Sequence, residues 1–239
     1  MSNLAVKLPN KKTPPKKIMK QIIKLQKTGH YKDSLQYCNK LVKNGYETPE
    51  LLHCHGLALR AWDDFQGALL KIHSAHEMRP EDPEILTSLG IIFFDLKEYE
   101  AAIELLKRST QLDEKSYLTW KCLGIALRMV ERYEAAEIAF TYARHLDPSQ
   151  VEPVLNMIVM LNNTRAYDKA KVLLDDLLKY EKNRIPSILL KRLHVAARLQ
   201  DLKYIEDNYH KIERSGLNLD EKAEIDNIWA YYLELNFRY

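Results

Sequence analysis

The chain has 239 residues, of which 46% are hydrophobic and 29% are charged, and its formal net charge is only +3. This is the composition of an ordinary folded protein and excludes a disordered or fibrous chain. No apolar stretch reaches the roughly 18 residues that a membrane span needs, and Met1–Lys20 has no apolar core of signal-peptide length.

The N-terminal part of the chain is strongly basic. Residues 1–28 contain no acidic residue and carry Lys7, Lys11, Lys12, Lys16, Lys17, Lys20, Lys24 and Lys27. We expect residues 1–14 to form a basic, disordered tail that leads into a basic first helix. Such a run can also recruit a protein to an anionic surface, either a membrane or a nucleic acid. We rank this alternative below binding to another protein.

Similar residues recur along the chain at an interval of 34 residues. The pairs that show it best are Leu89-Gly90 with Leu123-Gly124, Tyr99 with Tyr133, and Ala102 with Ala136. Without gaps, the interval divides residues 15–184 into five repeats that begin at Pro15, Pro49, Pro83, Tyr117 and Val151. A period of this length is typical of solenoids, in which one helix pair cannot bury its apolar face alone and neighbouring pairs must stack.

The repeat at residues 117–150 has the most complete pattern. Its characteristic residues are Trp120, Leu123, Gly124, Leu127, Tyr133, Ala136, Phe140, Ala143 and Pro148. In type and spacing they resemble the tetratricopeptide repeat (TPR) family. The resemblance implies an all-α fold, a right-handed α-solenoid of tandem helix-turn-helix pairs with a C-terminal capping helix. Each pair would have an A helix followed by a B helix.

Some repeats depart from the family pattern. Ser109 and Glu114 replace the expected Ala and Pro of the third repeat, and Ile22 and Ile158 replace the Gly at repeat position 8. Position 8 is small in the family because helix B of the same repeat approaches closely there. The first and fifth repeats are therefore expected to be less regular than the three between them.

Local signals mark where the helices begin. Thr48-Pro49-Glu50 and Asp82-Pro83-Glu84 each combine an N-cap residue, a Pro at the first helical position and an acid in the first turn. Ser116 can cap the next A helix. Gly29 is expected in the turn between the two helices of the first repeat.

The repeat pattern weakens after residue 184. Residues 185–218 are predicted to form a degenerate sixth pair, with an A helix over 187–199 and a B helix over 202–213. Residues 219–239 are predicted to form a capping helix and a short tail, because apolar residues recur at helical spacing over 220–235. An atypical last repeat is expected, since one face of it must meet water.

The resemblance also implies a binding groove, because the A helices of TPR proteins line a concave face with positions 2, 5, 9, 12 and 13. Position 9 is aliphatic in each A helix: Ile23, Leu57, Ile91, Ile125, Val159 and Leu193. Further apolar residues at the other groove positions are Met19, Phe94, Leu118, Met129, Leu155 and Leu189. A continuous apolar strip marks an interaction site. We predict that it binds an apolar or amphipathic segment of a partner protein.

Polar residues flank this strip: Lys27, His53, Arg60, Asp95, Lys121, Arg128, Asn162 and Asn163. The two asparagines can clamp a peptide backbone, because an amide side chain both donates and accepts hydrogen bonds. Some TPR proteins grip the C-terminal carboxylate of a chaperone with Lys and Asn at positions 5 and 9 of the first repeat. Met19 and Ile23 stand there in this chain, which argues against such a clamp.

Two alternatives remain open. The position-9 side chains could pack between neighbouring A helices, because this position lies near the boundary between them. The chain could also be a self-assembling scaffold, a homo-oligomer in which the aromatic tail at residues 236–239 enters the groove of a neighbour.

The sequence has no motif that predicts catalysis. It contains no Gly-rich phosphate loop, no Gly-x-Ser-x-Gly and no His-Glu-x-x-His. Cys38, Cys54 and Cys122 lack metal-ligand spacing and are expected to be buried, reduced thiols. We therefore predict a non-enzymatic scaffold, adaptor or chaperone in the cytoplasm, with no cofactor, metal or small-molecule substrate.

Overall fold

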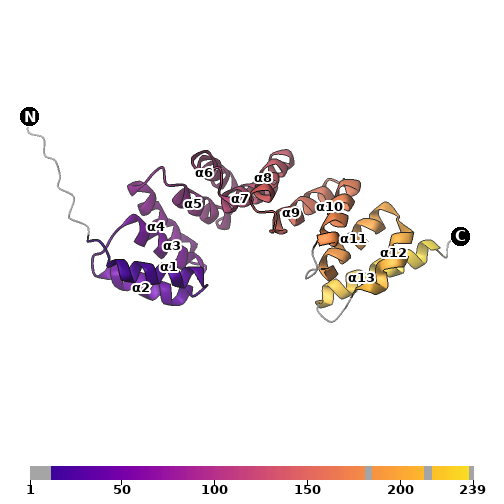
Figure 1. Cartoon of the computed structure of the whole chain (residues 1–239), viewed down its shortest axis with the longest axis horizontal. Coiled ribbons are helices and arrows are strands. Elements are labelled where there is room, and N and C mark those ends of the chain that lie inside the picture. Colours follow the sequence, from indigo (N-terminus) through magenta and orange to yellow (C-terminus); the bar gives the residue numbers. More distant parts are fainter. Residues whose placement is uncertain (1–11, 181–184, 213–216, 237–239) are drawn as a thin grey trace, which may run out of the picture. The chain divides into compact units, whose positions relative to one another are not determined.

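The computed structural model describes residues 12–180, 185–212 and 217–236. Most of the predicted basic tail and residues 237–239 of the predicted aromatic tail lie outside these ranges. Within them the chain is all-α, as predicted, and its only β-type pairing is an isolated bridge between Lys12 and Tyr46 (Figure 1). The chain divides into two compact units, Met1–Leu146 and Asp147–Tyr239.

The first unit contains four helix pairs. They are α1 (Lys16–Lys27) with α2 (Tyr31–Lys43), α3 (Pro49–Arg60) with α4 (Phe65–Met78), α5 (Pro83–Asp95) with α6 (Tyr99–Leu112), and α7 (Tyr117–Met129) with α8 (Tyr133–Leu146). Each A helix contacts the B helix of its own pair, and each A helix from α3 on also contacts the B helix before it. This alternating contact is the stacking that the 34-residue interval predicts.

The predicted helix starts are confirmed. The Thr48 hydroxyl accepts a hydrogen bond from the Leu51 amide at 3.3 Å, and the Ser116 hydroxyl accepts one from the Thr119 amide at the same distance. The Asp82 carboxylate accepts from the Glu84 amide at 3.1 Å. Each contact satisfies an amide of the first turn that has no partner within the helix.

The turns between A and B helices share one backbone conformation. Gly29 has the predicted role there, with φ of +76°. At the same repeat position, and also with positive φ, stand Asp63, Lys97, Glu131 and Arg165. An L-residue in this conformation costs about 1–2 kcal/mol, so the tight turn is maintained by the packing of the two helices it joins.

Close helix approach explains the Gly at position 8. A Cβ added to Gly124 would lie 2.6 Å from Cε1 of Phe140 on helix α8. Phe140 is fully buried, so a shift of its ring would disturb the core around it. In the first pair the sizes of the two residues are reversed. The large residue, Ile22, stands at position 8 of α1 and belongs to the same core cluster as the small Cys38 of α2.

The third repeat carries Ser109 where Ala is usual because its hydroxyl takes part in a buried network. The Thr87 hydroxyl lies 2.8 Å from the Ser109 hydroxyl and 2.7 Å from that of Thr119. Ser109 also donates to the Pro83 carbonyl at 2.8 Å. The network links α5, α6 and α7, and it satisfies polar groups that would otherwise be costly to bury.

The second unit contains α9 (Glu152–Asn163), α10 (Tyr167–Tyr180), α11 (Ile185–Leu199), α12 (Leu202–Asn208), a 3-10 turn (Tyr209–Lys211) and α13 (Leu219–Asn236). The last B helix is shorter than the predicted 202–213 and ends in the 3-10 turn. Helix α13 packs on α11 and α12 through Ile225, Ile228 and Tyr232.

In the sixth helix pair, an arginine stacked on a tyrosine replaces the small residues that the TPR pattern has at positions 8 and 20. Arg192 stands at position 8 and is buried, and its guanidinium carbon lies 3.8 Å from the ring centre of Tyr204, which stands at position 20. The Arg192 Nε donates to Asp175 at 2.7 Å, and its Nη2 lies 3.8 Å from Asp201. These contacts compensate the buried charge, and they explain why the sequence pattern weakens here.

Replacing Gly124 with Ala should lower the free energy of unfolding by up to about 2 kcal/mol. The added methyl overpacks the contact with Phe140, which outweighs the gain of about 1 kcal/mol in helix propensity. Chemical denaturation of Gly124→Ala measures the loss. Phe140→Leu in the same chain should reduce the effect of the substitution, and an equal effect in both backgrounds would contradict this packing.

His55 makes the stability of the first unit depend on pH. Burial, aided by nearby Lys71, lowers the pKa of His55 from 6.5 to about 4. Its Nδ1 is buried and has no hydrogen-bond partner among the described residues. As the pH falls below about 6.5, the unfolded chain binds a proton at His55 that the folded chain does not, so the free energy of unfolding decreases.

Between pH 7 and pH 4 the loss from His55 should approach about 3 kcal/mol. His55→Leu restores the residue usual at this TPR position. Between pH 7 and pH 4 its free energy of unfolding should fall by about 3 kcal/mol less than that of the wild type. Denaturation curves of both proteins at several pH values test this. Parallel pH profiles would show that His55 does not titrate on unfolding.

Candidate functional site

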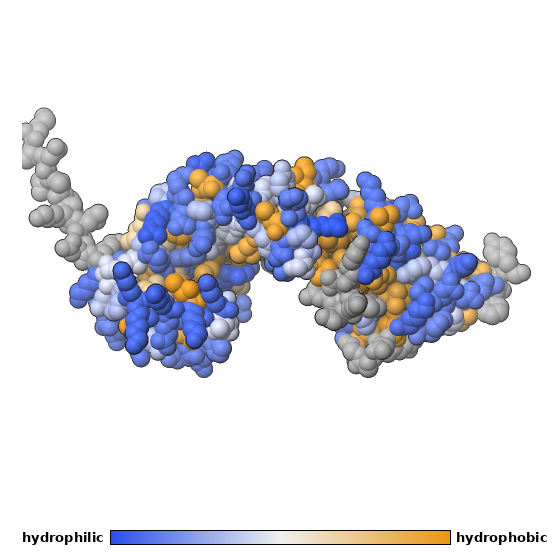
Figure 2. Space-filling model, viewed as in Figure 1, coloured by the Kyte–Doolittle hydropathy of each residue, from blue (hydrophilic) through white to orange (hydrophobic). Residues whose placement is uncertain are grey.

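The A helices of the first unit form a groove. A pocket of about 530 Å³ lies between α1, α3 and α5, and four predicted site residues line it: Ile23, Lys27, His53 and Leu57. Figure 2 shows apolar atoms between hydrophilic side chains on one face of this unit. The groove therefore combines apolar contact with polar groups that can orient a ligand.

The position-9 side chains in this unit are neither buried nor fully exposed. Ile23 is 40% exposed, and Leu57, Ile91 and Ile125 are half-buried. The residue that follows Ile91, Ile92, is completely buried. Packing between neighbouring A helices thus covers part of each position-9 side chain and leaves the rest open to solvent.

Other apolar groove residues in the first unit follow the same pattern. Leu118 is 47% exposed and Met129 is 40% exposed. Met19 is half-buried. Phe94 is half-buried too, and its ring lies 5.3 Å from the ring of Tyr99. Binding to a partner would remove the remaining apolar surface from water.

In the second unit the predicted strip is interrupted. Val159 is 37% exposed and Leu155 is half-buried, but Leu193 is completely buried and Leu189 is nearly so. The prediction that Leu193 faces an open groove is wrong. Helix α13 packs over α11 and places Leu189 and Leu193 in one cluster with Ile225, Ile228 and Tyr232.

Two predicted polar residues neutralise each other. Arg60 at the end of α3 forms a two-point ion pair with Asp95 at the end of α5, in which its Nη2 donates to Oδ1 at 3.3 Å. The sequence predicted both residues but not their pairing, because positions 12 and 13 of successive repeats meet only when the helices are stacked. The pair removes net charge from this part of the groove.

His53 is a neutral polar group in the wall of the groove. Its Nε2 lies 2.7 Å from the Ser88 hydroxyl of α5. Burial lowers the pKa of His53, against the opposing effect of Glu84 and Asp82. At neutral pH the ring therefore contributes hydrogen bonding without positive charge.

The remaining predicted polar residues differ in their surroundings. The Arg128 Nε is buried and has no hydrogen-bond partner among the described residues, and the same holds for the Asn162 Oδ1 of the second unit. Asn163 is exposed, and Lys121 lies with its ammonium 5.9 Å from the ring centre of Tyr117.

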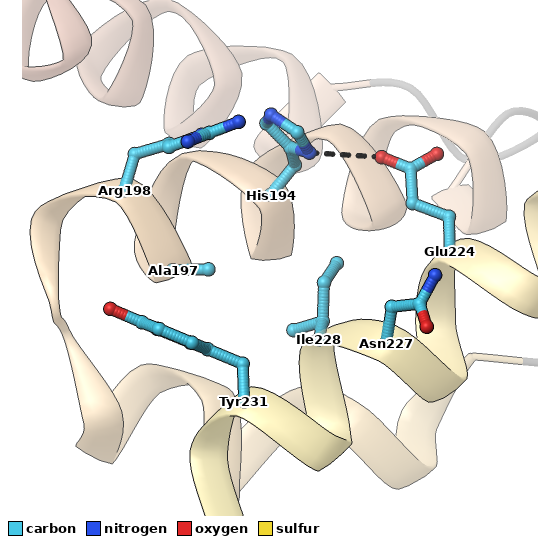
Figure 3. A pocket seen from close by; sticks show the side chains of 7 residues that line it. All are labelled: His194, Ala197, Arg198, Glu224, Asn227, Ile228 and Tyr231. Carbon is cyan, nitrogen blue, oxygen red and sulfur yellow. Dashed lines mark hydrogen bonds and ion pairs between the residues drawn. The ribbon is translucent and has the colours of Figure 1, made fainter. Parts of the chain in front are cut away.

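A second concavity, which the sequence did not predict, lies in the C-terminal unit. It has a volume of about 420 Å³ between α11 and α13 (Figure 3). His194 of α11 and Glu224 of α13 meet at one side of it, with 3.0 Å between Nδ1 and Oε1. Ile228 and Tyr231 of α13 also line it, so the amphipathic pattern over 220–235 was the available signal.

The described residues contain no group of three or more His, Cys, Asp or Glu placed to hold a metal ion. In the same part of the chain, no helix is both long and apolar enough to cross a membrane. Burial raises the pKa of Cys38 to about 12 and that of Cys54 to about 11, so both side chains remain protonated thiols.

The stacked pairs and the groove on the A helices define a TPR-type solenoid. Solved structures agree with this assignment. The protein described as Pseudomonas aeruginosa pilF is 16% identical, covers 88% of this chain and 96% of its own, and has a TM-score of 0.72. A tetratricopeptide repeat protein from Parabacteroides merdae is 15% identical, with coverages of 92% and 86% and a TM-score of 0.67. The chain therefore has the tetratricopeptide repeat fold.

Curated proteins match a smaller part of the chain. The peroxisomal targeting signal receptor of Kluyveromyces lactis is 29% identical over 113 residues, which are 47% of this chain and 20% of the receptor. The BBSome complex member BBS4 of Mus musculus is 28% identical over 116 residues, 48% of this chain and 22% of that protein. The chain thus spans about a fifth of the length of these relatives. No family model matches it.

Proposed function

We propose that the chain is a protein-interaction module that binds an apolar or amphipathic segment of a partner protein in the groove formed by α1, α3, α5 and α7. The observation that carries this proposal is the row of partly exposed aliphatic side chains at position 9, which includes Ile91 on α5 and Ile125 on α7. Burial of such surface in a complex is favourable.

The polar groups of the groove suit a polypeptide ligand. His53 is uncharged, and the Arg60–Asp95 pair is internally neutral. Hydrogen bonds from such groups orient a backbone, while the aliphatic row supplies affinity. The names of the two curated relatives, a targeting signal receptor and a complex member, both denote binding to other molecules and support this class of function.

Within the C-terminal unit, the partly exposed aliphatic residues at position 9 do not continue beyond α9. Leu193 is covered by α13, and the pocket beside it is lined by His194 and Glu224 instead of a row of aliphatic residues. The proposal therefore rests on the first unit alone and involves no catalytic step.

The double substitution Ile91→Asp and Ile125→Asp should abolish peptide binding in this groove. Each aliphatic side chain transferred into a complex contributes roughly 1.5–3 kcal/mol when fully buried, so affinity should fall by about a hundredfold or more. The probe is a random peptide library displayed on phage and selected on the wild-type protein. The selected peptides are then measured by fluorescence polarisation.

A matched control is available on the B helices. Leu70 and Ile138 are 70% and 58% exposed and lie outside the groove. The double variant Leu70→Asp and Ile138→Asp should bind the selected peptides as the wild type does. Circular dichroism establishes that all three proteins fold. If selected peptides lacked apolar residues, or bound the folded groove variant normally, the proposal would fail.

A further inference from the structure

The first A helix differs from the later ones on the edge that faces away from α3. In α3, α5 and α7, repeat positions 3 and 10 are buried against the preceding pair. The residues at position 3 are Leu51, Ile85 and Thr119, and those at position 10 are Ala58, Ile92 and Ala126. In α1 the same positions are Lys17 and Lys24, with Lys20 at position 6, and all three are exposed. This edge of the first unit therefore presents positive charge where later repeats present apolar surface.

Solvation alone does not explain the sign of this charge. A polar edge keeps a solenoid soluble, and a mixture of acidic and basic residues would serve. Helix α1 has instead five lysines and no acidic residue. Two pairs of them, Lys16 with Lys20 and Lys20 with Lys24, are four residues apart, a spacing at which like charges repel. An anionic surface that docked on this edge would relieve the repulsion.

The C-terminal unit has an edge of opposite sign. Helix α13 contacts both α11 and α12, as α5 contacts both α3 and α4, so it takes the place of a further A helix. It carries five acidic residues and one lysine: Asp220, Glu221, Glu224, Asp226, Glu234 and Lys222. Three of the acids, Asp220, Asp226 and Glu234, are exposed.

We propose that the lysine edge of α1 docks on the acidic face of α13 in a second copy of this chain. The contact is head-to-tail and joins two different surfaces. The two edges match in the sign of their charge, because Lys17 and Lys24 are exposed two turns apart on α1 and Asp226 and Glu234 are exposed on α13. The peptide groove takes no part in this contact.

Other anionic occupants fit the edge less well. Insertion into a lipid surface requires an exposed apolar face, whereas Ile22 of α1 is buried and only Ile23 is largely exposed on this helix. Recognition of nucleic acid commonly uses Arg and aromatic side chains, and α1 contains neither. These occupants are tested as competing outcomes.

Charge reversal tests the proposal in sedimentation velocity runs on the full chain at low salt, about 20 mM, and at about 0.5 M salt. The wild type should associate with increasing concentration at low salt and dissociate at high salt. The variants Lys17→Glu/Lys24→Glu and Asp226→Lys/Glu234→Lys should each associate at least about tenfold more weakly. An equimolar mixture of the two variants should associate again, because each supplies an edge complementary to the other.

A third variant controls for net charge. Lys107→Glu/Lys115→Glu changes the net charge by the same amount at exposed positions away from both edges, and it should associate as the wild type does. A wild type that stays monomeric at every concentration, or a mixture that stays monomeric, overturns the proposal. The proposal is also overturned if the wild type is monomeric and its α1 lysines bind anionic vesicles, duplex RNA or polyglutamate.

Discussion

The structure depends on one packing constraint: a two-helix unit cannot bury its own apolar surface, so each A helix must divide its circumference among several neighbouring helices. In α5, Gly90 meets the B helix of its own pair, and Ile85 and Ile92 meet the preceding pair. Ile91 lies between these contacts and is covered only in part. Stacking therefore leaves a row of half-exposed side chains at position 9. The type of residue at that position decides whether the groove is apolar.

The same constraint accounts for the two ends of the chain. On α1, which no described helix precedes, positions 3, 6 and 10 carry Lys17, Lys20 and Lys24. Where the last pair departs from the pattern, Arg192 and Tyr204 fill positions 8 and 20 as a stacked pair. Helix α13 then covers α11, so that Leu193 becomes core instead of groove. The first and last described helix pairs thus differ from the interior repeats in charge and in packing.

Features that follow from local sequence could be predicted, and those that depend on stacking could not. The helix pairs, the caps at Thr48 and Asp82 and the close approach at Gly124 follow from residue type and the 34-residue interval. The Arg60–Asp95 pair was missed because it joins successive repeats. The burial of Leu193 was missed because it requires the placement of α13. Which residues a partner touches stays a prediction.

Selective thiol labelling tests the central claim, that stacking leaves position 9 open while the next residue is buried. In a background with Cys122→Ala, Cys38 and Cys54 are buried and stay protonated. A thiol placed by Ile91→Cys should react with a maleimide reagent in the folded protein, and one placed by Ile92→Cys should react only after unfolding. Equal protection of both thiols in the folded protein would show that adjacent helices close the row, and the account of the groove would be wrong.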